Sequence, residues 1–288
     1  MRKFALAAGG MAVALALTAC GGDGDDTNGL SVGGGGGTFG DLQQLVASVE
    51  DKAEQVQSVK FDAEMTMLGM QFTMTGQTRI DPDDIAMSMT MSMAGGEQEM
   101  RIVDETIYMK VPELGEPGKS WVKRDLSEEF AELENDGTAA TLLENSDPRK
   151  ALEQFQEAGG TITSSEATTL DGRPVTRYTL EIDAVEMAKA SGEIPAEMMP
   201  MMESLGTIPA LVYLDSDALP VRMEVEMDMS AMLEEAAEVS GEEIPAELRD
   251  NPDMLTMSIS QDYYDWGEPV TIEAPPADQV SSKPLEDF

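Results

Sequence analysis

Strict alternation of apolar and polar residues constrains the fold of this chain more than any other feature of its sequence. In segment 85–93 every odd position is Ile or Met, and the even positions are Ala, Ser or Thr. Segments 221–229 and 255–260 alternate in the same way. A period of two places the apolar side chains on one face of a strand, which is typical of an antiparallel sheet covered on a single side.

Less regular segments raise the predicted number of strands to about eleven. They are residues 60–68, 70–80, 98–103, 105–111, 120–124, 161–169, 174–182 and 207–215. Short turn sequences rich in Asp, Gly and Pro join several of these segments. The spacing therefore predicts a meandering sheet.

Helical periodicity occurs between the groups of strands. It predicts a helix over 41–59, a second helix that begins at Ser127, and a third that begins at Asp147-Pro148 and ends at Gly159-Gly160. Strands and helices without regular βα alternation favour the α+β class. We expect one domain over 41–288, an open antiparallel half-barrel sheet with helices covering its concave, apolar face.

The first twenty residues resemble the export signal of a bacterial lipoprotein. Arg2 and Lys3 precede an apolar run, and Leu-Thr-Ala-Cys at 17–20 resembles a lipobox. Cys20 is the sole cysteine. We predict a signal peptide over 1–19 and lipidation of Cys20, which anchors the chain to the extracytoplasmic side of the cell membrane through acyl chains.

A flexible tether is predicted to follow the lipidated cysteine. Residues 20–40 are rich in Gly and Asp and include five consecutive glycines at 33–37. Such a segment behaves as a coil with a mean reach of about 25 Å. No later apolar run reaches the roughly 20 residues that a membrane-spanning helix needs.

The charge balance excludes several classes of function. The chain has 18 basic and 56 acidic residues, no histidine and a formal charge of −38. Such a negative field repels nucleic acid. Without histidine or a second cysteine, the usual nucleophilic triads and zinc sites cannot form. We therefore expect neither enzymatic activity nor a cofactor.

Methionine is unusually abundant, with 23 residues. Its unbranched, polarizable side chain adapts to apolar ligands of variable shape. Ordinary core packing is the alternative role for each of these residues. The predicted cavity-lining, lipid-binding positions are Met65, Met67, Met74, Met87, Met89, Met91, Met223, Val225, Met227 and Met257.

The sequence also contains an internal repeat. Residues 180–197 and 225–247 each read as a strand, an Asp, an amphipathic helix and a Gly-Glu-Ile-Pro-Ala-Glu motif, with one extra Glu in the second copy. We expect two equivalent helical excursions from the sheet. They are either the two sides of a cavity mouth or simple surface connections.

The order of these elements resembles a known family. The pieces SWVK (120–123), LDSDALPVRMEVEM (214–227) and YYDWGEPVTIEAPPADQV (263–280) are similar to actinobacterial lipoproteins of the LppX/LprG type, which share the LolA/LolB carrier fold. The resemblance implies an apolar cavity between a half-barrel and its helices. It further implies binding and transfer of a lipid or glycolipid. We also expect an envelope transporter as a partner. We expect a monomer.

Two other functions stay open at this point. One is a surface lipoprotein with a packed core that docks to an envelope protein. The other is copper(I) binding by thioethers, although same-face methionines on one strand lie about 6.5–7 Å apart, which is far for chelation. Calcium at Asp81, Asp83 and Asp84, or at Asp215 and Asp217, is a weaker idea than turn formation.

Overall fold

The structure, a computed structural model, describes residues 38–53, 55–81, 84–93, 96–104, 106–111, 118–125, 147–190, 199–241 and 244–282. These residues belong to one compact unit, Gly34–Phe288. The predicted signal peptide, Cys20, most of the predicted tether and the helix expected from Ser127 lie outside the described residues.

All eleven predicted strands are present, and they form a single antiparallel sheet. The strands are β1 (Ser58–Met67), β2 (Met70–Asp81), β3 (Asp84–Met93), β4 (Gly96–Val103), β5 (Thr106–Lys110), β6 (Trp121–Asp125), β7 (Thr161–Leu170), β8 (Arg173–Asp183), β9 (Thr207–Leu214), β10 (Pro220–Asp228) and β11 (Thr256–Tyr264). With its helices the chain is α+β, as the sequence predicts.

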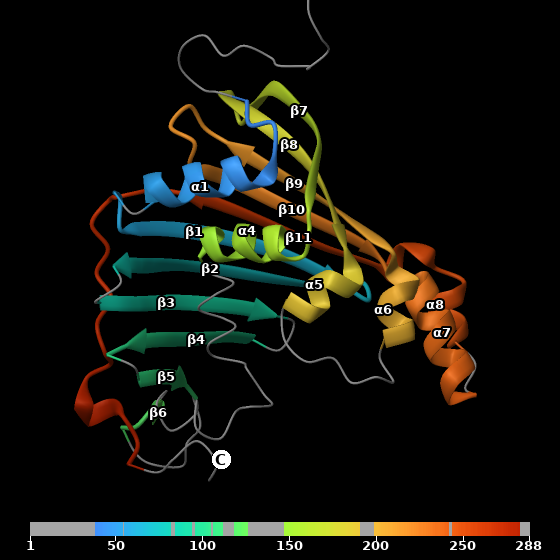
Figure 1. Cartoon of the computed structure of the whole chain (residues 1–288). Coiled ribbons are helices and arrows are strands. Elements are labelled where there is room, and N and C mark those ends of the chain that lie inside the picture. Colours follow the sequence, from blue (N-terminus) through green and yellow to red (C-terminus); the bar gives the residue numbers. More distant parts are fainter. Residues whose placement is uncertain are drawn as a thin grey trace, which may run out of the picture. The chain divides into compact units, whose positions relative to one another are not determined.

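The strand order consists of two meanders that meet in the middle of the sheet. The order is β6-β5-β4-β3-β2-β1-β11-β10-β9-β8-β7. Strand β6 therefore lies at one edge and β7 at the other (Figure 1). The strands that come first and last in the sequence, β1 and β11, are neighbours in the middle of the sheet, with Phe61 opposite Tyr263.

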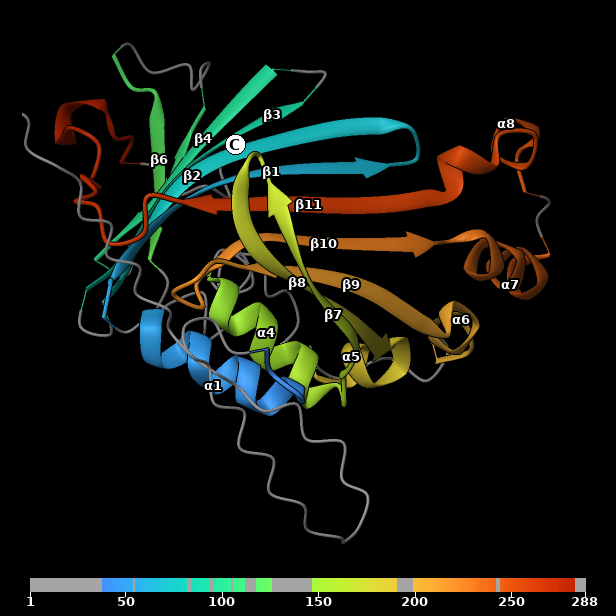
Figure 2. The ribbon, with the colours of Figure 1, turned by 90° about the horizontal axis from the view of Figure 1, so that it is seen from above.

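Two helices pack on the apolar face of the sheet. Helix α1 (Leu42–Ala53) buries Leu45 and Val49, and α4 (Pro148–Glu157) buries Leu152 and Phe155. These side chains join a core cluster that includes Phe61 and other sheet residues. Figure 2 shows both helices on the concave side of the bent sheet.

The predicted ends of these helices are correct for α4 and wrong for α1. Helix α4 begins after Asp147, whose Oδ1 accepts a hydrogen bond from the backbone N of Arg149 at 3.0 Å. Helix α1 ends at Ala53, whereas the sequence predicts Val59. Gln57 has a φ of 52°, which is incompatible with a continuing helix, and Val59 is instead buried in β1. The β-branched Val59 fits both periodicities, and sheet pairing prevails.

The two copies of the internal repeat lead into the expected helical excursions. The first contains α5 (Ala184–Ala190) and α6 (Met199–Leu205), and the second contains α7 (Ser230–Ser240), α8 (Ala246–Arg249) and η2 (Pro252–Leu255). Asp183 and Asp228 precede α5 and α7, and the side chain of each accepts a backbone N–H bond at 2.9 Å. Helices α6 and α7 pack against each other (Figure 1), so the excursions adjoin.

After β11 the chain returns as a C-terminal strap, residues 265–282. Its backbone oxygens at Thr271 and Glu273 accept hydrogen bonds from Gln77 and Arg101, at 3.0 and 3.1 Å. The strap ends against β6, where the N–H of Ser281 donates to the oxygen of Trp121 at 2.7 Å. It thus ties the first meander together on its convex side, and Trp121 is 3% exposed.

Candidate functional site

The sheet register brings all ten predicted lipid-binding residues onto one face. Met65 lies opposite Ile259, which in turn lies opposite Val225. Met74 lies opposite Met91, and Met227 lies opposite Met257. Directly opposed residues in an antiparallel sheet point to the same side. We call this apolar face of β1–β4, β10 and β11 the methionine face.

The methionine face divides into a buried part and a half-buried part. Met87, Met89 and Met223 are 0%, 6% and 6% exposed and belong to the core cluster that packs with α1 and α4. The half-buried members are Met65, Met67, Met74, Met91, Val225, Met227 and Met257. Core packing is thus the observed role of the first three, whereas the other seven are only partly covered, with Met74 and Val225 packed against the core.

Sequence reasoning missed two methionines, Met100 on the methionine face and Met109 beside it on β5. Met100 and Met109 continue a row that begins at Met89, because Met89 pairs with Met100 and Met100 pairs with Met109. Their own strands alternate less regularly, so only cross-strand register reveals the row. Side chains of opposed residues lie about 5 Å apart, which makes this row the arrangement most compatible with the copper(I) alternative.

Two hollows are described in the structure, and neither is lined by the methionine face. One is a notch of about 230 Å³ between α1 and α4. The other, of about 280 Å³, lies beside Tyr178, Lys52 and Asp215. Residues of α1, α4 and the segment around Asp215 line these two hollows, away from the methionine face.

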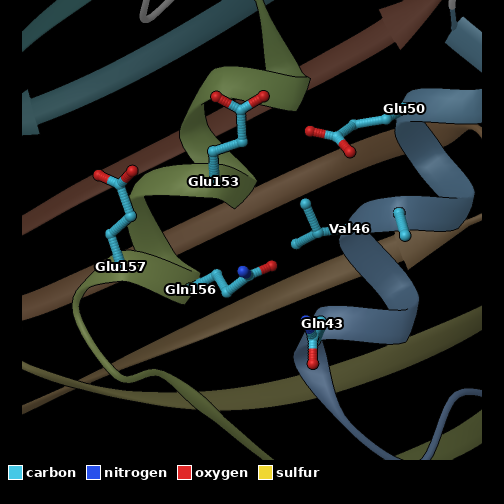
Figure 3. A pocket seen from close by; sticks show the side chains of 7 residues that line it. Gln43, Val46, Glu50, Glu153, Gln156 and Glu157 are labelled. Atoms are coloured by element: carbon cyan, nitrogen blue, oxygen red, sulfur yellow. The ribbon is translucent and has the colours of Figure 1, made fainter.

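The notch between α1 and α4 is acidic. Glu50 projects from α1 toward Glu153 on α4, and Glu157 lies one turn further along α4 (Figure 3). A side-chain hydrogen bond with Glu153, together with burial, raises the pKa of Glu50. Burial opposes ionisation of Glu153, but hydrogen bonds from Lys150 at 2.5 Å and from Glu50 outweigh it and lower the pKa of that carboxyl. The two carboxyls thus share one proton more readily than isolated ones do.

Two hydroxyls beneath the helices are buried and lack a hydrogen-bond partner in the described part of the chain. They belong to Thr78 on β2 and Tyr263 on β11. Burial, with a contribution from Asp147, raises the pKa of Tyr263 above its ordinary value. Buried hydroxyls without partners are costly, so each of the two positions is a weak point of the core.

Of the carboxylates considered for calcium, Asp215 stabilises a turn, and Asp83 lies outside the described residues. Asp215 Oδ1 accepts hydrogen bonds from the backbone N of Asp217 and of Leu219, at 2.9 and 3.0 Å. Among the described residues no three His, Cys, Asp or Glu side chains converge as metal ligands would. The described helices also include none with the length and apolar character needed to span a bilayer.

Comparisons with known proteins leave the family open. No protein-family model matches the chain, and no curated protein matches it. The crystal structure of MucB in complex with MucA(peri) is similar at 12% identity and a TM-score of 0.33, over 83% of this chain and 58% of that one. This chain thus spans little more than half the length of that match.

A second solved structure is similar over most of both chains. It is a DUF1329 family protein from Desulfovibrio piger, with 10% identity and a TM-score of 0.24, covering 80% of this chain and 95% of that one. Both TM-scores lie below 0.5, so these likenesses are distant and assign neither a family nor a function.

Proposed function

We propose that this chain is a membrane-anchored extracytoplasmic lipoprotein that binds the acyl chains of a lipid or glycolipid against its methionine face. The observation that carries the proposal is the set of seven half-buried apolar residues on that face, beside a fully buried core. The likeness to LppX/LprG-type lipoproteins in the sequence supports the same function. No covalent chemistry is part of the proposal.

The physical driving force is burial of the acyl chain. Each buried CH₂ contributes about 0.8 kcal/mol, so one long chain supplies roughly 10 kcal/mol before ordering costs. Thioether side chains repack around such ligands at little cost because methionine is unbranched. The half-buried residues already lack full packing, so a ligand gains contacts there without displacing a core side chain.

The charged residues of the same strands lie on the face opposite the methionine face, which supports lipid binding on one face of the sheet only. Glu64, Glu224 and Glu226 alternate with the apolar positions and therefore lie on the convex face. There they keep the sheet hydrated. Acylated Cys20 holds the domain at the membrane, and an envelope transporter that loads or unloads the lipid is the expected partner of a monomeric carrier.

Native mass spectrometry and lipid extraction of the full chain, purified from an actinobacterial host, test this function. Stoichiometric acyl-containing lipid that survives purification is the expected result, and its mass identifies the ligand. A clean protein mass, with no uptake on incubation with membrane lipids, contradicts the proposal.

A second candidate function is an interaction lipoprotein with a packed core. Two observations favour it: Met87, Met89 and Met223 are closely packed, and both described hollows lie elsewhere. In that case the methionines stabilise the domain and a protein partner binds the surface. Co-purification of a stoichiometric envelope protein, with no lipid, is the result that distinguishes it.

A further inference from the structure

Charged residues are absent from two neighbouring stretches of this acidic chain. Residues 65–78 and 85–96 are runs of fourteen and twelve positions without Asp, Glu, Lys or Arg, although 26% of the chain is charged. The first run contains the end of β1, the turn and most of β2, and the second contains all of β3 except Asp84. Because β2 pairs with β3, the two runs are side by side.

Exposed apolar side chains gather at one end of these runs. Among the described residues, the large hydrophobic side chains that are exposed are Leu68, Met70 and Met93, at 37%, 51% and 42%. Single exposed hydrophobics are ordinary, but these three share one end of the sheet. We call Leu68, Met70 and Met93 the exposed rim.

The register shows how close the rim residues are. Met70 pairs with Met67 beside the β1–β2 turn, and Ser92, the neighbour of Met93, pairs with Thr73. Met93 therefore lies one strand away from Met70 and two residues along, at a Cα separation of about 8 Å for ordinary strand spacings. Both side chains point to the side of the methionine face.

The rim is continuous with the methionine face. Met67, Met65 and Met91 follow inward from the rim and are half-buried. On the other side, the Met254 side chain of η2 packs on the turn, since a Cβ at Gly69 would be 3.3 Å from its Cε. An apolar path thus leads from the exposed rim to the half-buried residues.

We propose that the exposed rim docks onto the surface of a lipid bilayer of low surface charge. Large apolar side chains enter the boundary between headgroups and acyl chains favourably, and a rim without charge pays no cost for desolvating ions. The absence of Lys and Arg from both runs argues against recognition of an acidic protein or of anionic headgroups. The commitment to a bilayer rests on the proposed lipid anchor at Cys20.

The predicted tether is long enough for this contact. Seventeen residues lie between Cys20 and Thr38, where the described part of the domain begins, and that many extended residues span about 60 Å. A ten-residue strand such as β1 is only about 33 Å long. An anchored chain can therefore turn its rim to the membrane, and an acyl chain then passes between bilayer and methionine face without crossing water.

The test uses the full chain in phosphatidylcholine vesicles that contain nitroxide-labelled acyl chains. An environment-sensitive dye is attached to Met70→Cys, which is the single free thiol once Cys20 is acylated. The matched position is Glu268→Cys, exposed at the other end of β1, where the N–H of Gly267 donates to Ser58. The expected result is blue-shifted, lipid-quenched emission at 70 and unquenched emission at 268.

A charge-insertion pair makes the result specific. Met70→Glu/Met93→Glu adds two charges to the rim, and Gln71→Glu/Thr75→Glu adds two to exposed positions on the opposite face of β2. With the dye moved to Leu68→Cys, quenching is expected to disappear in the first variant and persist in the second. All four altered residues are exposed, so we expect both variants to fold.

Equal quenching at positions 70 and 268 overturns the proposal. Quenching that requires a second protein in the vesicles also overturns it and assigns the rim to a protein partner. Lipid mass spectrometry of the same samples separates this proposal from the proposed function. Bound lipid without quenching at the rim contradicts only the docking of the rim onto a bilayer. Quenching at the rim without bound lipid contradicts only the proposed lipid-carrier function.

Discussion

Met227 on β10 and Met257 on β11 are direct cross-strand partners on the methionine face, and both are half-buried. Their Cβ atoms are about 5 Å apart in this kind of pairing. Glu226, the neighbour of Met227, faces the opposite side and pairs with Ser258. The methionine pair can therefore be altered without disturbing the convex face.

Replacing this pair by glutamine should weaken lipid binding more than it weakens the fold. In Met227→Gln/Met257→Gln we expect clear loss of retained lipid in native mass spectrometry. The stability cost should stay near 1–2 kcal/mol because both side chains are only partly buried. Glu226→Gln is the control and should retain lipid. Unchanged lipid stoichiometry in the double variant would exclude this part of the face as the binding surface.

Met89→Gln should instead weaken the fold itself. Met89 is 6% exposed and lies in the core cluster, so a buried amide without partners should cost about 2–4 kcal/mol. Urea unfolding followed by the fluorescence of Trp121 and Trp266 measures the change in midpoint. Met91→Gln, two residues along the strand and half-buried, should cost less. Equal, small losses at both positions would mean that the buried part of the face is also open.

Gly76→Ala should destabilise the sheet next to the seam between β1 and β11. A Cβ at Gly76 would lie 2.5 Å from the ring of Phe61 and 2.9 Å from the backbone oxygen of Ser88. Such overpacking costs about 1–3 kcal/mol, read as a lower melting temperature. The companion Gly76→Ala/Phe61→Leu should recover part of the loss. A neutral Gly76→Ala would show that the Phe61 ring moves freely.

Glu50→Gln should alter how stability depends on pH. The raised pKa of Glu50 means that the folded chain holds its proton more tightly than the unfolded chain does. The stabilisation is complete below the unfolded pKa and is lost as pH rises through the folded one. Glutamine donates a hydrogen bond to Glu153 at every pH. The variant should therefore match the wild type near pH 4 and exceed it at pH 7 by up to about 1 kcal/mol.

Melting temperatures from pH 4 to pH 8 measure this effect. Glu157→Gln removes the same charge from the same notch, without the hydrogen bond to Glu153, and serves as the control. A difference between Glu50→Gln and wild type that stayed constant over this range would show that the two carboxyls titrate independently.

The strands were predictable from the sequence because their side chains alternate. Which strands pair with each other in the sheet was not predictable. In segment 85–93 the methionines reveal both the strand and its apolar face. Nothing in that pattern indicates that Phe61 lies opposite Tyr263, 202 positions later in the chain, because period two assigns a face and leaves the partner strand open. The end of α1 was mispredicted for a related reason, since Val59 suits either periodicity.

The candidate site was predictable as a set of residues, but its division by burial was not. Met89 and Met91 have the same residue type, strand and face, yet one is buried and the other half-buried. The difference depends on what packs over each position, including helices from distant parts of the sequence such as α4. A local pattern contains no information on such packing.

The seam between β1 and β11 has a consequence for how the chain reaches its native state. The first strand to be synthesised acquires its second neighbour only when the last strand has emerged, so the sheet has many contacts of long sequence separation. Chains with such topology fold slowly, and until β11 has paired, β1 and β10 each present an unpaired, methionine-containing edge that is open to wrong pairing. A chain that is exported from its N-terminus would cross the membrane before its centre could form, and it would complete its fold only on the far side.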